Sequence, residues 1–137
     1  MPRAAINSRA VLAVALGGCI GGPLRYAAGE LFPAQSGEVP WTILVVNVLG
    51  TAVLAVLLVF VLAGATTRPY LREFVGVGIL GSFTTFSTWM VQSQTLIDDG
   101  RPERALVYLG GSLLLGLLAA VGGSVLGRSL ISGRRRM

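Results

Sequence analysis

Four long stretches without a charged residue divide the chain. They run over residues 10–24, 41–67, 74–97 and 105–127. A helix that spans a membrane needs about 20 mainly apolar residues, each adding about 1.5 Å of length. The last three stretches meet this requirement directly, and the first meets it when it is extended through Arg25. The pattern predicts a single all-α membrane domain over residues 1–137, with spans at about residues 9–29, 41–66, 72–97 and 104–128.

The first stretch also has the outline of a secretory signal peptide, because an apolar run follows a basic start. Its second half contains four glycines, Gly17, Gly18, Gly21 and Gly22. Small residues spaced three or four apart let helices approach closely in lipid. We therefore predict that the segment is retained as a membrane helix. A mature chain that begins after Ala28 would contradict this prediction.

Composition agrees with a membrane protein and narrows the chemistry. Hydrophobic residues make up 53% of the chain and charged residues 12%, whereas soluble domains carry about 25% charged residues. The chain has no histidine, and no acidic residue lies within an apolar stretch. Zinc sites and histidine-based catalysis are thereby excluded, and we expect no enzymatic activity. The basic residues are all arginines in tails, loops and span ends, which is typical of membrane proteins, so we expect no nucleic-acid partner.

The arginines also predict an orientation in the membrane. Three of them, Arg25, Arg101 and Arg104, belong to one side. The side with both termini and the second loop has eight, namely Arg3, Arg9, Arg68, Arg72, Arg128, Arg134, Arg135 and Arg136. Arginine is enriched in cytoplasmic loops. The excess therefore predicts that both termini lie in the cytoplasm.

Polar residues gather in the third stretch. Gly76, Gly78 and Gly81 precede the hydroxyl-rich segment 82–88. Glycine and threonine are weak helix formers, so we expect the third helix to be broken near the middle of the membrane. Unwound backbone at that depth persists only inside protein or beside a polar cavity. Half-helix N-termini favour anions and freed carbonyls can hold a cation, so the residues predict an ion site without naming the ion.

The side chains available for this site are hydrogen-bond donors. Arg25, hydroxyls and the amide of Asn47 donate, and aromatic ring edges are positive, which suits a small anion. Two alternatives are a small multidrug-resistance-type exporter and a non-transporting membrane assembly subunit. The exporter would need an intramembrane carboxylate for proton coupling, and the first stretch has none. The assembly subunit would have its polar residues scattered among the helices.

Three motifs carry a resemblance to a known family. They are Gly-Cys-Ile-Gly-Gly-Pro-Leu-Arg-Tyr at 18–26, the segment from Thr42 to Thr51, and Gly-Ile-Leu-Gly-Ser-Phe-Thr-Thr-Phe-Ser-Thr at 78–88. In these motifs, their order and the number of spans, the chain resembles the Fluc (CrcB-type) fluoride channels. The resemblance implies an antiparallel, dual-topology dimer with two pores in the cell membrane. It also implies passive fluoride export that lowers cytoplasmic toxicity, and a structural Na⁺ ion at the dimer centre.

The resemblance assigns roles by motif position. The backbone carbonyls of Gly81 and Thr84 would hold the Na⁺ ion. Because Phe86 and Trp89 are three residues apart, their rings would share one helix face, and their edges would pass fluoride along. The whole anion path would comprise Phe86, Trp89, Asn47, Ser87, Thr88, Tyr108, Ser112 and Arg25.

Three positions depart from the family pattern. Trp89 stands where phenylalanine is usual and brings an N–H donor. Gln92 replaces a frequent glutamate, and Ser82 replaces a common glycine. Some family members form heterodimers of two oppositely inserted sister chains, and the arginine bias is typical of a fixed orientation. The expected partners are therefore fluoride, membrane lipid and either a second copy of this chain or a sister subunit.

Overall fold

The computed structural model describes residues 7–64 and 68–134. It contains α1 (Ser8–Leu31), α2 (Trp41–Leu62), a π-helix η1 (Arg72–Leu80), α3 (Gly81–Phe83), α4 (Ser87–Asp98) and α5 (Pro102–Arg134). Within these described residues, four helical segments are long and apolar enough to cross a membrane, with η1, α3 and α4 together forming the third. The prediction of an all-α protein with four membrane-spanning helices is confirmed.

The helix ends differ somewhat from the predicted spans. Helix α2 ends at Leu62, earlier than the predicted end near residue 66, and residues 65–67 lie outside the described part. Helix α5 runs from Pro102 to Arg134, beyond both predicted ends. Charged residues at each end extend the helix past the uncharged stretch, because a helix can continue into water where its apolar run has ended.

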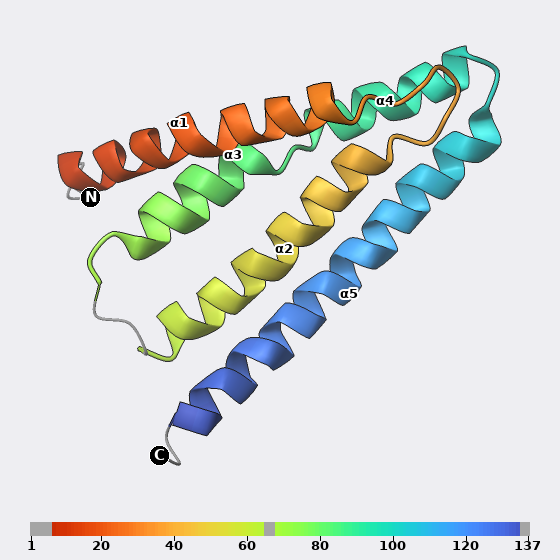
Figure 1. Cartoon of the computed structure of the whole chain (residues 1–137). Helices are drawn as coiled ribbons and strands as arrows, with labels where there is room; N and C mark the ends of the chain where they lie inside the picture. The colour runs from red at the N-terminus through yellow and green to blue at the C-terminus, as the bar shows by residue number, and fades with distance from the viewer. Residues whose placement is uncertain (1–6, 65–67, 135–137) are drawn as a thin grey trace, which may run out of the picture.

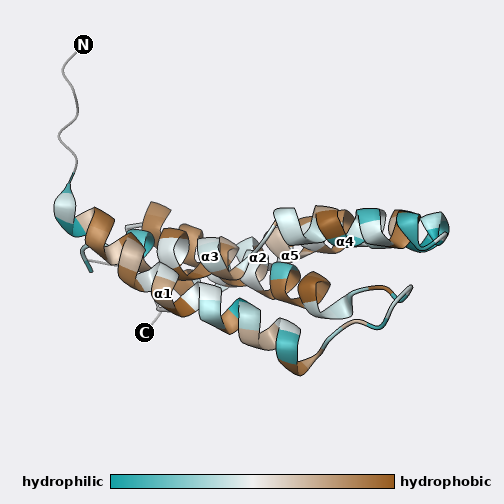
Figure 2. Ribbon diagram, turned by 90° about the horizontal axis from the view of Figure 1, so that it is seen from above, coloured by the Kyte–Doolittle hydropathy of each residue, from teal (hydrophilic) through white to brown (hydrophobic). Residues whose placement is uncertain are grey.

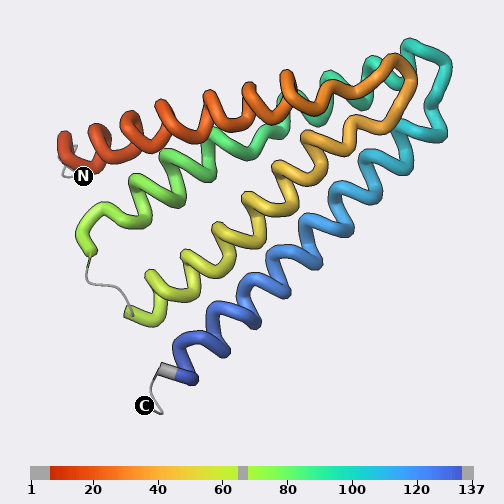
Figure 3. The backbone as a smooth tube through the Cα atoms, in the orientation of Figure 1, coloured from red at the N-terminus to blue at the C-terminus, as the bar shows by residue number. Residues whose placement is uncertain are grey.

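The helices lie side by side in a shallow slab (Figures 1 and 2). The third span lies between α1 and α2, and α5 packs against the other side of α2. The start of α1, the end of α2, the start of η1 and the described end of α5 lie at one end of the slab, and the first and third connections lie at the other (Figure 3). The described parts of the two groups of segments that the arginine pattern distinguished thus lie at opposite ends of the slab, and the cytoplasmic location of the termini stays a prediction.

Glycines bring α1 against the π-helix. A Cβ on Gly17 would meet the carbonyl oxygen of Phe74 and would lie 2.8 Å from the Cα of Gly78. A Cβ on Gly21 would meet the carbonyl oxygen of Ile79. Backbone-to-backbone packing of this kind stabilises helix pairs in lipid, where no hydrophobic effect drives helices together. The predicted role of the glycine-rich first span is thus seen directly in the contact between α1 and η1.

A second pair of glycines joins α5 to α2. A Cβ on Gly123 would lie 2.5 Å from the carbonyl oxygen of Ala52, and one on Gly127 would lie 2.9 Å from Cβ of Val59. The two helices pack against each other along most of their length. The sequence is therefore organised as two closely packed helix pairs, α1 with η1 and α2 with α5.

The first and third connections are tied together by polar contacts. Asp99 accepts hydrogen bonds from the Ser36 hydroxyl and the Gly37 N–H, both at 3.1 Å. Nη1 of Arg104 donates to the Gly37 carbonyl at 2.6 Å. Gly100, at φ 72°, provides the left-handed residue that ends α4 and lets the chain turn into α5. These contacts hold the first and third connections beside the C-terminal end of α4.

Replacing Gly21 by alanine should disrupt the packing of α1 on η1. Because the new methyl group would meet a backbone carbonyl that cannot rotate away, we expect a loss of about 1–3 kcal/mol of stability. The measurement is the thermal unfolding midpoint of the purified protein in detergent. Gly22→Ala is the matched control, since no described residue outside its own stretch of helix lies within 4 Å of its Cβ position. Equal midpoints for the two variants would contradict this packing.

Candidate functional site

The third span is interrupted at Thr84. This residue is extended, with φ −78° and ψ 155°, and the helix resumes at Ser87. The interruption lies near the middle of the span Arg72–Asp98. Gly50 of α2 lies opposite, and the Thr84 methyl group occupies the space where a Cβ on Gly50 would be. The predicted helix break is therefore present, and it is packed against a position in α2 that has no side chain.

The break follows an irregular first half of the span. Residues 72–80 form a π-helix, and the Gly81 N–H donates to the carbonyl of Gly76, five residues earlier. Single π turns are commonly found at functional sites, and a π stretch this long is rare. The π-helix was not predicted from the sequence. Gly81 itself is helical, at φ −65° and ψ −30°, so the extended backbone begins three residues after it.

Asn47 of α2 binds the backbone of the break through both ends of its amide group. Its Nδ2 donates to the Thr85 carbonyl at 2.9 Å, and its Oδ1 accepts from the Thr85 N–H at 2.8 Å. A single side chain thus supplies both hydrogen bonds that the unwound residue has lost. Since unsatisfied backbone groups are costly in lipid, this pair stabilises the interruption. One Nδ2 hydrogen is left over for another acceptor.

The hydroxyl of Thr85 caps the second half of the span. It accepts from the Thr88 N–H at 3.2 Å and donates to the Thr88 hydroxyl at 3.1 Å. It also lies 3.3 Å from the hydroxyl of Ser87, which is exposed. A threonine oxygen in this place satisfies one of the free N–H groups at the start of α4. Ser87 and Thr88, both predicted to line an anion path, therefore belong to a hydroxyl cluster at this N-terminus.

Arg25 of α1 binds the other side of the break. Its Nε donates to the Ser82 carbonyl at 3.1 Å, where α3 ends. A cation at a helix C-terminus is stabilised by the helix dipole. The same side chain lines a cavity of about 250 Å³ together with Thr42, Thr88 and Gln92. Arg25 thus both supports the break and faces a cavity that extends to the first connection.

The carbonyls of Gly81 and Thr84 have lost their regular helical donors. In an uninterrupted helix they would accept from the N–H groups of Thr85 and Thr88. Those two groups instead donate to Asn47 and to the Thr85 hydroxyl. Carbonyls freed in this way are ligands of the kind that bind Na⁺ in broken membrane helices. The two carbonyl oxygens, of Gly81 and Thr84, are therefore suitable ligands for the Na⁺ ion that the sequence resemblance implies.

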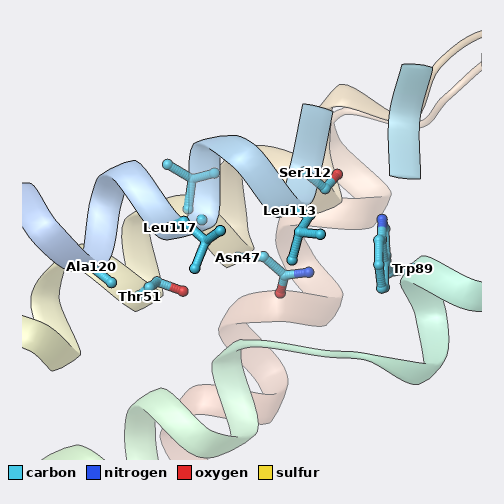
Figure 4. A pocket seen from close by; sticks show the side chains of 9 residues that line it. Asn47, Thr51, Trp89, Ser112, Leu113, Leu117 and Ala120 are labelled. Carbon is cyan, nitrogen blue, oxygen red and sulfur yellow. The ribbon is translucent and has the colours of Figure 1, made fainter. Parts of the chain in front are cut away.

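A cavity of about 310 Å³, called the central cavity below, lies between α2, α4 and α5 (Figure 4). Its polar lining comes from Asn47, Thr51, Trp89 and Ser112. The remaining lining is apolar or small: Val48, Leu113, Gly116, Leu117 and Ala120. Within the described part of the chain, Nε1 of Trp89 and Oγ of Ser112 are buried without a hydrogen-bond partner.

The rings of Phe86 and Trp89 contact each other directly. Their centroids are 5.4 Å apart and their planes meet at 64°, an edge-to-face arrangement. Phe86 is 70% exposed, while Trp89 packs on the buried cluster around Leu96. The shared helix face predicted from their spacing is observed. The exposed Phe86 ring remains available to a group outside the chain.

Tyr108 and Ser112 of α5 occupy different environments. The Tyr108 side chain is fully buried, and its hydroxyl donates to Oε1 of Gln92 at 2.8 Å. Ser112, one turn further along, lines the central cavity. Gln92 also lines the cavity that Arg25 faces. The predicted path residues on α5 are therefore divided between a buried hydrogen bond and the central cavity.

Thr51 and Gln92 both line a cavity and were not among the predicted site residues. Thr51 lines the central cavity one turn after Asn47, and the four-residue spacing on α2 was the signal that could have identified it. Gln92 was noted only as a departure from a family pattern. Its hydrogen bond to Tyr108 joins residues 16 apart across two helices, which no local pattern in the sequence reveals.

The fold and the site define a class: a four-helix membrane protein whose broken third span adjoins a cavity in which every polar lining residue is uncharged. Residues 12–124 match the family model described as CrcB-like protein, Camphor Resistance (CrcB). The chain belongs to this family, as the sequence resemblance indicated.

Similar proteins carry a common description. The chain is 44% identical to "Fluoride-specific ion channel FluC 3" of Streptomyces avermitilis, over 98% of this chain and 66% of that protein. It is 42% identical to "Fluoride-specific ion channel FluC 2" of Nocardia farcinica, over 92% and 90% respectively. It is also 42% identical to a "Fluoride-specific ion channel FluC" of Thermus thermophilus, over 88% and 96%. The alignment thus spans about two thirds of the Streptomyces protein and nearly all of the other two.

Replacing Asn47 by alanine should loosen the break. The change removes two hydrogen bonds and leaves the Thr85 N–H without its acceptor, which costs about 1–3 kcal/mol. We expect the Thr85 amide to exchange its hydrogen at least about tenfold faster, as measured by hydrogen–deuterium exchange. Thr51→Val is the matched control, because it alters the same cavity and leaves the Asn47–Thr85 pair intact. Unchanged exchange at Thr85 in Asn47→Ala would refute the role of the two Asn47–Thr85 hydrogen bonds in stabilising the break.

Proposed function

We propose that this chain is a subunit of a passive fluoride channel that exports fluoride across the cell membrane and so lowers its toxicity in the cytoplasm. The observation that carries the proposal is membership of the CrcB family together with relatives named as fluoride-specific ion channels. The central cavity supports it, since its polar lining consists of an amide, two hydroxyls and an indole. The protein would act as a channel and not as an enzyme.

The chemistry of the cavity suits a small anion. Fluoride is strongly hydrated, so a path through the membrane has to replace water with other donors. The polar residues of the cavity offer donors, and none of its lining residues is acidic. Uncharged donors also bind an anion less tightly than a fixed cation would, and conduction requires that the ion can leave. A carboxylate in the same place would repel fluoride.

The proposed path has two described parts. On the outer side, Arg25, Thr88 and Gln92 line the cavity that forms a vestibule. Deeper in, Asn47 and Ser112 line the central cavity. The Phe86–Trp89 pair and the hydroxyl cluster of Thr85, Ser87 and Thr88 lie at the break between the two half-helices. Tyr108 would act indirectly, because its hydroxyl holds the side chain of Gln92, which lines the vestibule.

An antiparallel dimer would cover groups that one chain leaves exposed or without a hydrogen-bond donor. The Phe86 ring is largely exposed, and the carbonyls of Gly81 and Thr84 are freed at the same break. Two copies would bring four such carbonyls together, a number that suits a structural Na⁺ ion. When bound, the ion would supply a fixed positive charge that holds the two breaks together. The second chain would be either another copy or a sister subunit of opposite orientation.

Fluoride release from proteoliposomes tests the function. Liposomes that contain the purified chain are loaded with potassium fluoride, and a potassium ionophore is added while fluoride-selective and chloride-selective electrodes record. We expect fluoride release and little chloride release. Protein-free liposomes are the control. A chain that forms a stable homodimer without releasing fluoride would overturn the proposal for that homodimer, whereas release by the homodimer would remove the need for a sister subunit.

The Asn47→Asp variant examines the path in the same assay. A carboxylate beside the anion should slow fluoride release at least about tenfold through repulsion. Undiminished release would remove Asn47 from the path while leaving the channel proposal in place.

Removal of Na⁺ tests the structural ion. An ion that binds only the assembled protein stabilises it by about 2.7 kcal/mol when present at 100 times its Kd. We expect the thermal midpoint of the protein in detergent to rise with Na⁺ in a saturable manner. N-methylglucamine chloride at equal ionic strength serves as the control, because its cation is too large for a carbonyl site. The same midpoint in both salts would contradict a bound Na⁺ ion.

A further inference from the structure

A groove near the start of α1 combines arginines with an apolar wall. It has a volume of about 330 Å³ and lies between α1, which forms one edge of the slab, and the segment that leads into η1 (Figure 1). Its polar lining comes from Arg9, Arg68 and Tyr70. The remaining lining is apolar: Leu12, Ala13, Leu16, Pro69, Leu71 and Phe74. Neither cavity of the proposed fluoride path includes any of these residues, so the groove is a separate feature.

The groove changes from polar to apolar along α1. Four of its lining residues recur every three or four positions, on one face of the helix: Arg9, Leu12, Ala13 and Leu16. Arg9 is the second residue of the span, and Leu16 lies about 10 Å further along the helix axis. Leu12 and Leu16 are 58% and 53% exposed. The face therefore presents a cation at the end of the span and uncovered aliphatic side chains deeper within it.

The electrostatics of this end favour an anion. Arg9 and Arg68 line the groove, and no acidic residue lies in the first turn of α1. Glu73 is the acidic residue closest in sequence to the lining residues, and it is not one of them. The helix dipole opposes a cation at a helix N-terminus, so Arg9 does not stabilise α1 in this place. Its charge adds to that of the helix end, and both attract an anion.

Tyr70 lies at the same end, with an unusual backbone. Its φ of 61° is in the left-handed region, which residues other than glycine rarely adopt. Its hydroxyl accepts a hydrogen bond from Nδ2 of Asn7 at 3.4 Å, so the hydroxyl hydrogen can be donated to a ligand. Tyrosine is enriched where a membrane meets water, because its ring is apolar and its hydroxyl is polar. Tyr70 therefore suits the boundary between a polar and an apolar part of one ligand.

We propose that this groove binds one anionic phospholipid, with its phosphate between Arg9 and Arg68 and one acyl chain along Leu12 and Leu16. Arginine binds phosphate through two parallel hydrogen bonds, and basic pockets beside membrane helices bind anionic head groups. A phospholipid is favoured over a free phosphate ion because only an acyl chain would cover the two leucines. The predicted cytoplasmic location of the termini would place this lipid in the leaflet that is rich in anionic lipid. The inference goes beyond the fluoride path and does not rest on it.

Native mass spectrometry tests the preference for an anionic lipid. The purified full chain in detergent is titrated with phosphatidylglycerol and, separately, with phosphatidylcholine that has the same acyl chains. Phosphatidylcholine has no net charge, so we expect one saturable phosphatidylglycerol per chain and at least about tenfold weaker binding of phosphatidylcholine. Equal binding of the two lipids would overturn the proposal.

Two variants test the arginines. Arg9→Gln and Arg68→Gln should each weaken phosphatidylglycerol binding about fivefold, the contribution expected of one arginine near a membrane surface. Arg128→Gln is the matched control, because it removes the same charge from near the described end of α5 and lies outside the groove. A loss in Arg128→Gln equal to that in Arg9→Gln would show a general attraction of lipid to the arginines, and the site would be rejected.

A photoreactive lipid locates the site in the unaltered protein. Phosphatidylglycerol with a diazirine in its acyl chain should label peptides that contain residues 12–16 or 71–74, and excess unmodified lipid should prevent this labelling. Excess glycerol 3-phosphate should not prevent it, and prevention would instead indicate a site for a free phosphate group. Labelling confined to other helices would contradict the proposal. So would labelling of monomeric protein only, because a second copy of the chain would then cover the groove.

Discussion

The structure depends on satisfying a backbone that has been unwound inside an apolar layer. Asn47 meets that requirement at Thr85 with one donor and one acceptor, and the surrounding features follow from it. Gly50 leaves room for the Thr84 methyl group, which lets α2 come close enough for Asn47 to reach. Each half-helix then ends at the break with unpaired backbone groups. Arg25 binds a carbonyl at the end of the first half, and the Thr85 hydroxyl binds an N–H at the start of the second. An ion site at the break is possible because Asn47 and the Thr85 hydroxyl accept the hydrogen bonds of the Thr85 and Thr88 N–H groups. The carbonyls of Gly81 and Thr84, which would accept these bonds in a regular helix, are then left to bind an ion.

Much of the fold could be predicted because the membrane imposes simple rules on composition. The four spans follow from long uncharged stretches, and the break follows from a concentration of glycine and hydroxyl residues near Thr84. The π-helix over residues 72–80 was not predicted, since it depends on a hydrogen-bond register that neighbouring helices select. The pairing of the helices was also not predicted from the sequence. Gly17 and Gly21 indicated close packing, but only the three-dimensional arrangement shows that their partner is the third span.

The candidate site was predictable in its residues more than in their interactions. Asn47 and Arg25 were singled out as hydrogen-bond donors in apolar spans and Ser112 through the family resemblance, and all three lie at the break or in a cavity beside it. Their bonding partners depend on side-chain rotamers and on contacts between helices, which leave no periodic pattern in a single sequence. Thus the double hydrogen bond of Asn47 to Thr85 and the pairing of Tyr108 with Gln92 appeared only in the structure. Trp89 was recognised as unusual, and the structure adds that its N–H is buried without a partner.

The pairing of the helices has a consequence for how the protein is made. Helix α1 packs on the third span and α2 packs on the fourth, so the two closely packed pairs interleave along the chain. Because a ribosome releases the chain from its N-terminus onward, the first two spans enter the membrane before the main partner of either one exists. Their glycine-containing faces therefore contact lipid or other proteins until their partners are inserted. For Gly17 and Gly21 of α1 this partner is the span Arg72–Asp98. The late segments therefore determine when this protein folds, although the first span contains the more conspicuous packing motif.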